Sequence, residues 1–268
     1  MTVEDSNRLG SGPRIPVGPF GVFDISWDEL VARLGETVPR GESHVAFAVH
    51  VGAFLNTDDL EYVAAMNRAD TVYADGSSVV MLAKIARAKT IERAVTTDVG
   101  WGVLRAARQA LGRPARIALI GGPGGLAAQA GAFMEHEGLA SCVVTADGYQ
   151  ESYAPVFDKM RAENVEIVFV GMGMPLEALW VDRHRGDFGS ALVMTCGGWF
   201  GYIVGDERRA PLWAQRLAME WVWRLAQSPG RLAKRYALGA VRVVTLIPGQ
   251  VRVRRSTRTQ GTIPERTQ

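Results

Sequence analysis

The chain has 268 residues, of which 47% are hydrophobic, which is enough for one full core with or without an appended segment. Its net charge of +2 conceals an uneven distribution, because residues 208–268 hold 13 of the 30 Lys and Arg but only 2 of the 28 Asp and Glu. Two cysteines exclude a disulfide framework, and no run approaches the roughly 18 apolar residues that a membrane-spanning helix needs.

The first half of the chain alternates apolar runs with helix-like segments. Residues 1–14 are polar and predict a flexible N-terminus without a secretory signal. An apolar run predicts a strand over 44–51, and Thr57 and Asp58 indicate the cap and first-turn acid of a helix over 57–68. The next predicted elements are a strand over 70–74 and helices over 79–88 and 101–111.

The second half continues this alternation. It predicts strands over 116–122, 141–149, 165–173 and 190–198, and helices over 127–138 and 154–164. Strands separated by helices form parallel sheets, and strands that are apolar throughout have both faces covered. The sequence therefore predicts an α/β fold, a Rossmann-like and mostly parallel sheet flanked by helices, over residues 15–205.

Glycine-rich or acidic turns follow five of these predicted strands, at 74–76, 121–125, 146–149, 171–175 and 196–201. Open parallel sheets bind ligands beyond the carboxyl ends of their strands, and glycine lets the backbone approach a phosphate closely. The turns favour a nucleotide-sized anion, although such turns also serve simply to reverse the chain. The GGPGG turn matches neither the dinucleotide fingerprint nor a P-loop.

The C-terminal segment 206–255 is basic, aromatic and helical in pattern. Trp213, Leu217, Trp221 and Leu225 recur every fourth residue and predict an apolar stripe on one helix. After the Pro229–Gly230 break, Arg231 and Arg235 fall on one face of a second short helix.

This composition is typical of a helix that lies on an anionic membrane surface, and a helix packed on the core is the alternative. No nucleic-acid motif is present. Residues 242–255 are compatible with a longer membrane contact or with a basic-ended strand, and residues 256–268 predict a disordered tail.

Nine sequence blocks in one order resemble the WecG/TagA/CpsF glycosyltransferases. They include LNTDDL (55–60), ADTVYADGSSVV (69–80), ERAVTTD (92–98), LIGGPGGLAAQA (119–130), VGMGMPLEALW (170–180) and EWVWRLAQSPGRLAKRY (220–236). The resemblance implies an inverting transfer from a UDP-sugar, carrying N-acetylmannosamine or another hexose or uronic acid, to a polyprenyl-diphosphate-linked saccharide. It places that reaction in bacterial cell-wall or surface-polysaccharide synthesis, on a cytoplasmic protein peripheral to the inner face of the membrane. Self-association is left open.

The resemblance also assigns roles to single residues. It makes Asp75 the catalytic base and gives substrate contacts to Asn56, Arg93 and Asp98. Residues expected to line the nucleotide pocket are Gly121, Gly122, Asp147, Tyr149, Gly171 and Gly173. Glu177 is expected beside the substrate, and Arg224, Arg231 and Arg235 at the acceptor diphosphate or the lipid headgroups.

Three departures separate this sequence from the family pattern. Phe54 replaces a threonine, Leu176-Glu177-Ala178 replaces Lys-Gln-Glu, and Thr96 replaces a glycine. These departures leave open the alternative that the chain is a family member that binds nucleotide without transferring sugar. A nucleotide-dependent oxidoreductase is the remaining alternative.

No acidic pair has the Asp-x-Asp spacing of metal-dependent sugar-nucleotide enzymes, so no cofactor and a metal-independent reaction are expected. The four histidines show no nucleophile–base arrangement and are expected to be structural or exposed.

Overall fold

A computed structural model describes residues 13–205, 211, 220–227 and 229–260, without the side chains of 220, 221, 224, 229, 231, 232 and 255–260. Its central sheet has six parallel strands in the order β4-β3-β8-β7-β5-β6. In chain order these are β3 (His44–Val49), β4 (Thr71–Ala74), β5 (Ala115–Gly121), β6 (Ala140–Ala146), β7 (Ile167–Gly171) and β8 (Leu192–Thr195). The predicted parallel α/β fold is confirmed.

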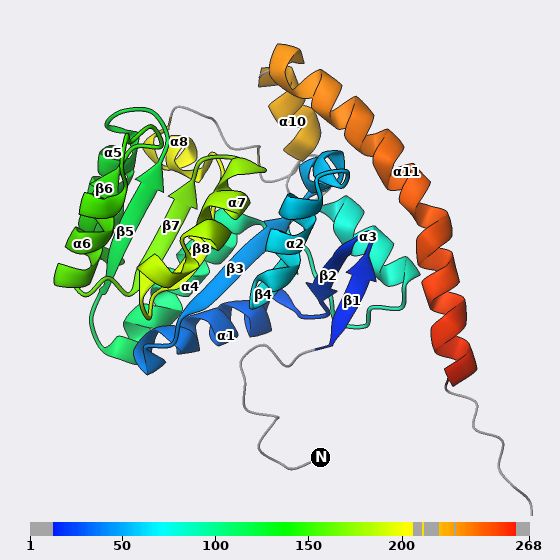
Figure 1. The fold of residues 1–268 in the computed structure, drawn as a ribbon, viewed down its shortest axis with the longest axis horizontal. Helices are drawn as coiled ribbons and strands as arrows, with labels where there is room; N and C mark the ends of the chain where they lie inside the picture. The colour runs from blue at the N-terminus through cyan, green and yellow to red at the C-terminus, as the bar shows by residue number, and fades with distance from the viewer. Residues whose placement is uncertain (1–12, 206–210, 212–219, 228, 261–268) are drawn as a thin grey trace, which may run out of the picture.

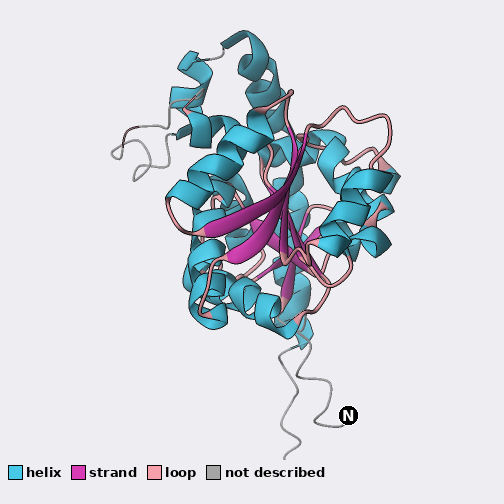
Figure 2. Ribbon diagram, turned by 90° about the vertical axis from the view of Figure 1, so that its left-hand side faces the viewer, coloured by secondary structure: helices cyan, strands magenta, loops and turns pink. Residues whose placement is uncertain are grey.

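Two helical layers enclose the sheet, which Figure 2 shows almost edge-on between them. One layer comprises α1 (Trp27–Arg40), α4 (Thr96–Leu111), α5 (Leu126–His136) and α8 (Trp199–Val204). The other comprises α2 (Leu60–Arg68), α3 (Ser77–Ile85), α6 (Ala154–Ala162) and α7 (Leu176–Arg183). Along β3, Phe47 packs into the second layer, and Ala46 and Ala48 into the first. Both sides of β3 are thus covered, which explains its continuous apolar run.

Several element boundaries differ from the sequence prediction. Helix α2 begins at Leu60, because the side chain of Asp59, not Thr57 or Asp58, caps it by accepting a hydrogen bond from Tyr62 N at 3.0 Å. Residues Val51–Asn56 form a 3-10 helix, η2, immediately after β3. Helix α4 begins at Thr96, five residues earlier than predicted.

The N-terminal part of the body contains elements that the sequence pattern did not indicate. Strands β1 (Arg14–Val17) and β2 (Phe20–Phe23) form an antiparallel hairpin. Its buried side chains Val17, Phe20 and Val22 join the core on the α2–α3 side of the sheet. Helix α1 follows, capped by Ser26, whose hydroxyl accepts from Glu29 N at 3.3 Å, and ended by Gly41 in the left-handed conformation.

Two C-terminal helices are described, α10 (Glu220–Gln227) and α11 (Pro229–Gln260). The second helix has 32 residues, so the prediction of a short helix is wrong, and residues 242–255 are helical rather than a strand. The tail predicted to be disordered is helical as far as Gln260. The predicted positions of Trp213 and Leu217, and the tail after residue 260, lie outside the described residues.

Helix α11 packs along the side of the body from η2 to the hairpin (Figure 1). Gly239 lies so close to Val51 that a Cβ atom there would come within 2.6 Å of its side chain. Val243 is buried, and the amide of Gln250 pairs with Pro16 O and Gly18 N at 2.8 Å each. No helix within the described part of the chain is long and apolar enough to cross a membrane.

Candidate active site

All five predicted turns follow strands of the one parallel sheet, so they meet at its carboxyl edge. In Figure 1 the strand arrows point to this edge, where α8, α10 and the start of α11 also lie. The chain leaves β3 toward β4 and leaves β5 toward β6, on opposite sides of the sheet. Such a reversal of direction is where open α/β sheets bind their ligands.

Asp75 is the first residue after β4 and is half-buried. Its backbone N donates to Val49 O at 2.9 Å, which ties the end of β4 to the end of β3. Its carboxylate accepts a hydrogen bond from Thr96 Oγ1, with Oδ2 at 2.9 Å. The carboxylate is therefore held in a fixed orientation at the ligand-binding edge of the sheet.

Thr96 connects Asp75 to the core. Its Oγ1 lies 2.9 Å from the hydroxyl of Tyr73, a fully buried residue of β4. The one hydroxyl hydrogen of Thr96 goes to Asp75, so the Tyr73 hydroxyl donates to Thr96. Burial raises the pKa of Tyr73, which keeps this donor protonated. Thr96, where the resemblance led to the expectation of a glycine, thus orients the candidate base, a role that the sequence did not reveal.

Three other predicted residues lie in segments at the carboxyl ends of β3 and β4. The segment before α4 runs beside β4, with Ala94 N donating to Ala74 O at 2.8 Å, and this places the half-buried Arg93 close to the loop of Asp75. Asp98 lies in the first turn of α4. Asn56 ends η2, where its amide donates to Gly52 O at 3.1 Å. The structure therefore brings these three residues to the same edge.

His50 and Arg235 also meet at this edge. His50 follows β3, and its Nδ1 accepts from Gly52 N at 3.0 Å. The Arg235 guanidinium of α11 contacts the imidazole, with Nη2 at 3.2 Å from Nδ1 and 3.4 Å from Nε2. A Cβ atom on Gly76 would lie 3.6 Å from His50 Cα, so the loops after β3 and β4 touch. The expectation of a structural role for the histidines fits His50, which caps η2, and the contact with Arg235 adds to that role.

Three of the glycines expected to line a nucleotide pocket, Gly121, Gly122 and Gly171, pack closely against neighbouring loops. Gly122 N donates to Gly171 O at 3.0 Å, and Gly148 N donates to Gly122 O at 2.9 Å. A Cβ atom on Gly121, whose φ is +133°, would come within 2.3 Å of Gly171 O. One on Gly171 would come within 2.8 Å of Gly197 O. We call Gly148, Gly122, Gly121, Gly171 and Gly197 the glycine row; it joins the loops after β6, β5, β7 and β8 side by side.

Glu177 lies under the end of this row. Its side chain is buried, and its Oε2 accepts hydrogen bonds from Gly173 N and Gly197 N at 3.0 Å each. Burial raises the pKa of Glu177 to about 7, against the opposing effect of these backbone N–H groups. The sequence expectation placed this carboxylate beside the substrate, whereas in the structure it points into the protein and binds the two loops from below.

A comparison with protein families matches residues 15–258 to the glycosyl transferase WecG/TagA/CpsF family. The chain belongs to this family. The matched region runs from the β1–β2 hairpin almost to the end of α11, so the basic C-terminal helices are part of the family region. The resemblance inferred from the sequence blocks is confirmed.

The remaining predicted residues of this glycosyl transferase lie in the loop after β6 and in the C-terminal helices. The loop after β6 holds Asp147, whose Oδ1 accepts from Tyr149 N at 2.9 Å, and the Tyr149 ring is 82% exposed. Arg224 lies in α10 and Arg231 in α11, and their side chains are outside the described residues. Phe54, which replaces the family threonine, is fully buried against Phe20 with ring centroids 6.0 Å apart.

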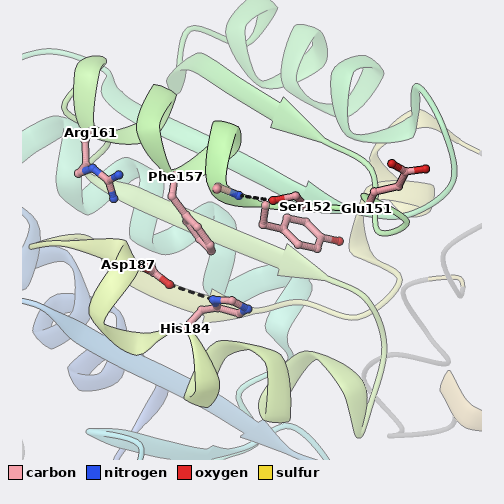
Figure 3. Close-up of a pocket in the computed structure, with 8 residues that line it drawn as sticks. Glu151, Ser152, Phe157, Arg161, His184 and Asp187 are labelled. Carbon is pink, nitrogen blue, oxygen red and sulfur yellow. Dashed lines mark hydrogen bonds and ion pairs between the residues drawn. The ribbon is translucent and has the colours of Figure 1, made fainter.

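A groove of about 400 Å³ lies between α6 and the end of α7 (Figure 3). Its lining includes Glu151, Ser152, Phe157, Arg161, His184 and Asp187. His184 Nδ1 lies 2.9 Å from Asp187 Oδ2, and Phe157 packs on the His184 ring. None of the residues predicted for the active site lines this groove.

The side chains present at the edge are carboxylate, hydroxyl, imidazole and guanidinium groups. Among the described residues no three His, Cys, Asp or Glu lie together as a metal site would require. Cys196 is buried and Cys142 half-buried, and burial raises the pKa of both thiols. That the reaction needs no metal stays a prediction.

Proposed function

We propose that this chain transfers a sugar, with inversion, from a UDP-linked donor to a polyprenyl-diphosphate-linked saccharide during bacterial cell-wall or surface-polysaccharide synthesis. Membership of the glycosyl transferase family supports sugar transfer. The observation that carries the assignment to this edge is the placement of Asp75. Thr96 orients the Asp75 carboxylate at the end of β4. In the neighbouring loop, which follows β3, His50 contacts the guanidinium group of Arg235.

The chemistry needs one base and one means of stabilising the leaving group. The acceptor hydroxyl oxygen attacks the anomeric carbon, and the bond from that carbon to the diphosphate oxygen breaks. UDP departs with the electron pair, and the hydroxyl proton passes to the Asp75 carboxylate. Because the nucleotide is already a good leaving group, one carboxylate is sufficient for a single displacement with inversion.

Cations at the edge would stabilise the departing diphosphate. Arg93 and Asn56 are proposed to position the substrate, and Arg235, together with Arg224 and Arg231, to hold a diphosphate or lipid phosphate. A guanidinium group suits this task because its planar donors pair with two phosphate oxygens at once. We propose that this reaction proceeds without a metal ion.

The outward face of α11 supports a location at the inner surface of the membrane. The side opposite Gly239 and Val243 carries exposed apolar residues at Leu238, Val241 and Val244. On the helix the exposed cations Lys234 and Arg252 share this side. An apolar strip with flanking cations matches a helix that lies in a headgroup layer, and anionic lipids add about 1 kcal/mol per basic residue at the surface.

The assignment of Asp75 is tested by Asp75→Asn, which keeps the acceptor for the Thr96 hydroxyl but removes the base. We expect sugar transfer to fall about 100-fold or more, and UDP affinity by calorimetry to stay within about threefold of wild type. Asp59→Asn is the matched control, because asparagine caps a helix as well as aspartate.

Two results would speak against this function. Full transfer by Asp75→Asn would show that the base lies elsewhere. Equal and very low UDP release by wild type and variant, with UDP still bound, would favour a family member that only binds nucleotide.

A further inference from the structure

Glu177 connects the loops after β7 and β8 beyond the point where the backbone hydrogen bonds between these strands end. The parallel ladder between β7 and β8 ends at the pair Val170 and Thr195, followed by one bond from Cys196 N to Val170 O at 2.8 Å. Beyond it, Gly173 and Gly197 each donate a backbone N–H to the same oxygen of Glu177. The carboxylate thus replaces the ladder as the link between the two loops.

The close contact of these loops depends on their composition. Gly171 has no Cβ atom to collide with Gly197 O, and so the loops approach within van der Waals distance. Glu177 enters from the first turn of α7 and satisfies two N–H groups that would otherwise lack a partner in this arrangement. The shape of the edge between β7 and β8 therefore depends on this side chain.

The charge on Glu177 also reaches the neighbouring part of the edge. Charged or titratable groups that interact with it come from α2, β4, the loop after β8 and α11, namely Tyr62, Tyr73, Cys196 and Arg235. Tyr62, Tyr73 and Cys196 have their pKa values raised by burial and by this carboxylate. Arg235 acts in the opposite direction and favours the ionised form of Glu177. The carboxylate and the guanidinium therefore attract each other across the edge.

We propose that Glu177 is a positioning residue of this enzyme: its carboxylate fixes the loops after β7 and β8 and draws Arg235 toward the edge that carries Asp75. The inference rests on the proposed function for its kinetic consequence. The structural part of the inference, the link between the two loops, is independent of the proposed function and can be measured without turnover. Glu177 reaches no substrate in this scheme and acts through the two loops and the arginine.

Two substitutions separate the effects of the hydrogen bonds and the charge. Glu177→Ala removes both, and we expect UDP affinity to fall about tenfold and kcat with it. Glu177→Gln retains an oxygen that accepts the N–H groups, so we expect UDP affinity within about threefold of wild type. Because the charge is gone, we expect kcat to fall about tenfold and the inflection near pH 7 in the wild-type kcat profile to disappear. Leu176→Ala, at an exposed neighbour on the same helix, is the control.

The kinetic results decide each half of the inference. Wild-type kcat and an unchanged pH profile in Glu177→Gln would overturn the role of the charge. Wild-type UDP affinity in Glu177→Ala would overturn the role of the hydrogen bonds.

Hydrogen exchange gives a readout that needs no sugar transfer. In Glu177→Ala we expect faster exchange in peptides covering 171–175 and 196–199, with no change in Leu176→Ala. Unchanged exchange in both loops would contradict the inference even if the enzyme is a glycosyltransferase. Conversely, a wild-type chain that transfers no sugar would refute the proposed function while this measurement still judges Glu177.

Discussion

The hydroxyl of Thr96 donates to the carboxylate of Asp75 at 2.9 Å and connects it to the buried Tyr73 hydroxyl. A carboxylate that receives such a bond has one defined orientation, which a proton-accepting base needs. The resemblance in the sequence leads to the expectation of a glycine at this position, and a glycine could not form this hydrogen bond.

Thr96→Val tests this support. Valine has the same shape, but it removes the bond to Asp75 and leaves the Tyr73 hydroxyl buried without its partner. We expect kcat to fall about tenfold, and stability to fall by about 1 to 3 kcal/mol because an unpaired buried hydroxyl is costly. The measurements are single-turnover transfer and thermal unfolding. Adding Tyr73→Phe should recover part of the stability but none of the rate, whereas simple additivity of the two stability losses would argue against the network.

Arg235→Ala tests whether the position of the cation or the total charge of the helix matters. We expect kcat/KM for a short, water-soluble diphosphate acceptor to fall about 30-fold, and Arg235→Lys to restore little because lysine lacks the planar fork. Arg252→Ala removes the same charge from the outward face of α11 and should leave this value unchanged. Equal losses in the two alanine variants would assign the effect to net charge instead.

The outward face of α11 predicts membrane binding that can be separated from catalysis. Val241→Asp combined with Val244→Asp places two acids on the exposed strip, and we expect binding to vesicles rich in phosphatidylglycerol to fall at least tenfold. Leu60→Asp changes an apolar residue of α2 that is 79% exposed and should have no effect. Vesicle flotation measures both. Retained binding by the double variant would place the membrane contact elsewhere.

Glu177 predicts a pH dependence of stability with a definite sign. Burial raises the pKa of Glu177 to about 7 from its ordinary value of 4.5, so the folded chain holds the proton more tightly than the unfolded chain. The stabilisation of the folded chain by this bound proton is complete at pH values below 4.5 and is lost as the pH rises through 7. Glu177→Gln does not titrate, so its free energy of unfolding relative to wild type should rise by about 2 to 3 kcal/mol between pH 5 and pH 8. Urea unfolding at the two pH values gives the difference; a constant or falling value would contradict it.

The sheet and its loops could be predicted from the sequence because their signals are local. Continuous apolar runs follow from a sheet covered on both faces, and glycine or aspartate after each run indicates the turn. Asp75 was found in this way, with its role supplied by the family resemblance. The hairpin at 14–23 escaped prediction because each strand has four residues, too short for its alternation to be distinctive.

The rest of the site depends on contacts between distant segments. His50 and Arg235 are 185 residues apart, and no local pattern indicates that α11 crosses the end of β3. The length of α11 was underestimated because Pro248 and the β-branched run around it disfavour a helix, whereas packing against η2, α3 and the hairpin favours one. The sequence placed Glu177 beside the substrate, because its contacts with the N–H groups of Gly173 and Gly197 exist only once the fold brings the two loops together.

The contacts of α11 at both the hairpin and η2 have a mechanical consequence. A helix of 32 residues extends roughly 50 Å. Because it contacts the body at both Gly239 and Gln250, it has a fixed orientation relative to the sheet. If its outer side rests on a bilayer, the tilt of the whole sheet and the height of Asp75 above the lipid are set together. The enzyme would then select acceptors by how far their reactive hydroxyl projects from the membrane plane, because the height of Asp75 is fixed.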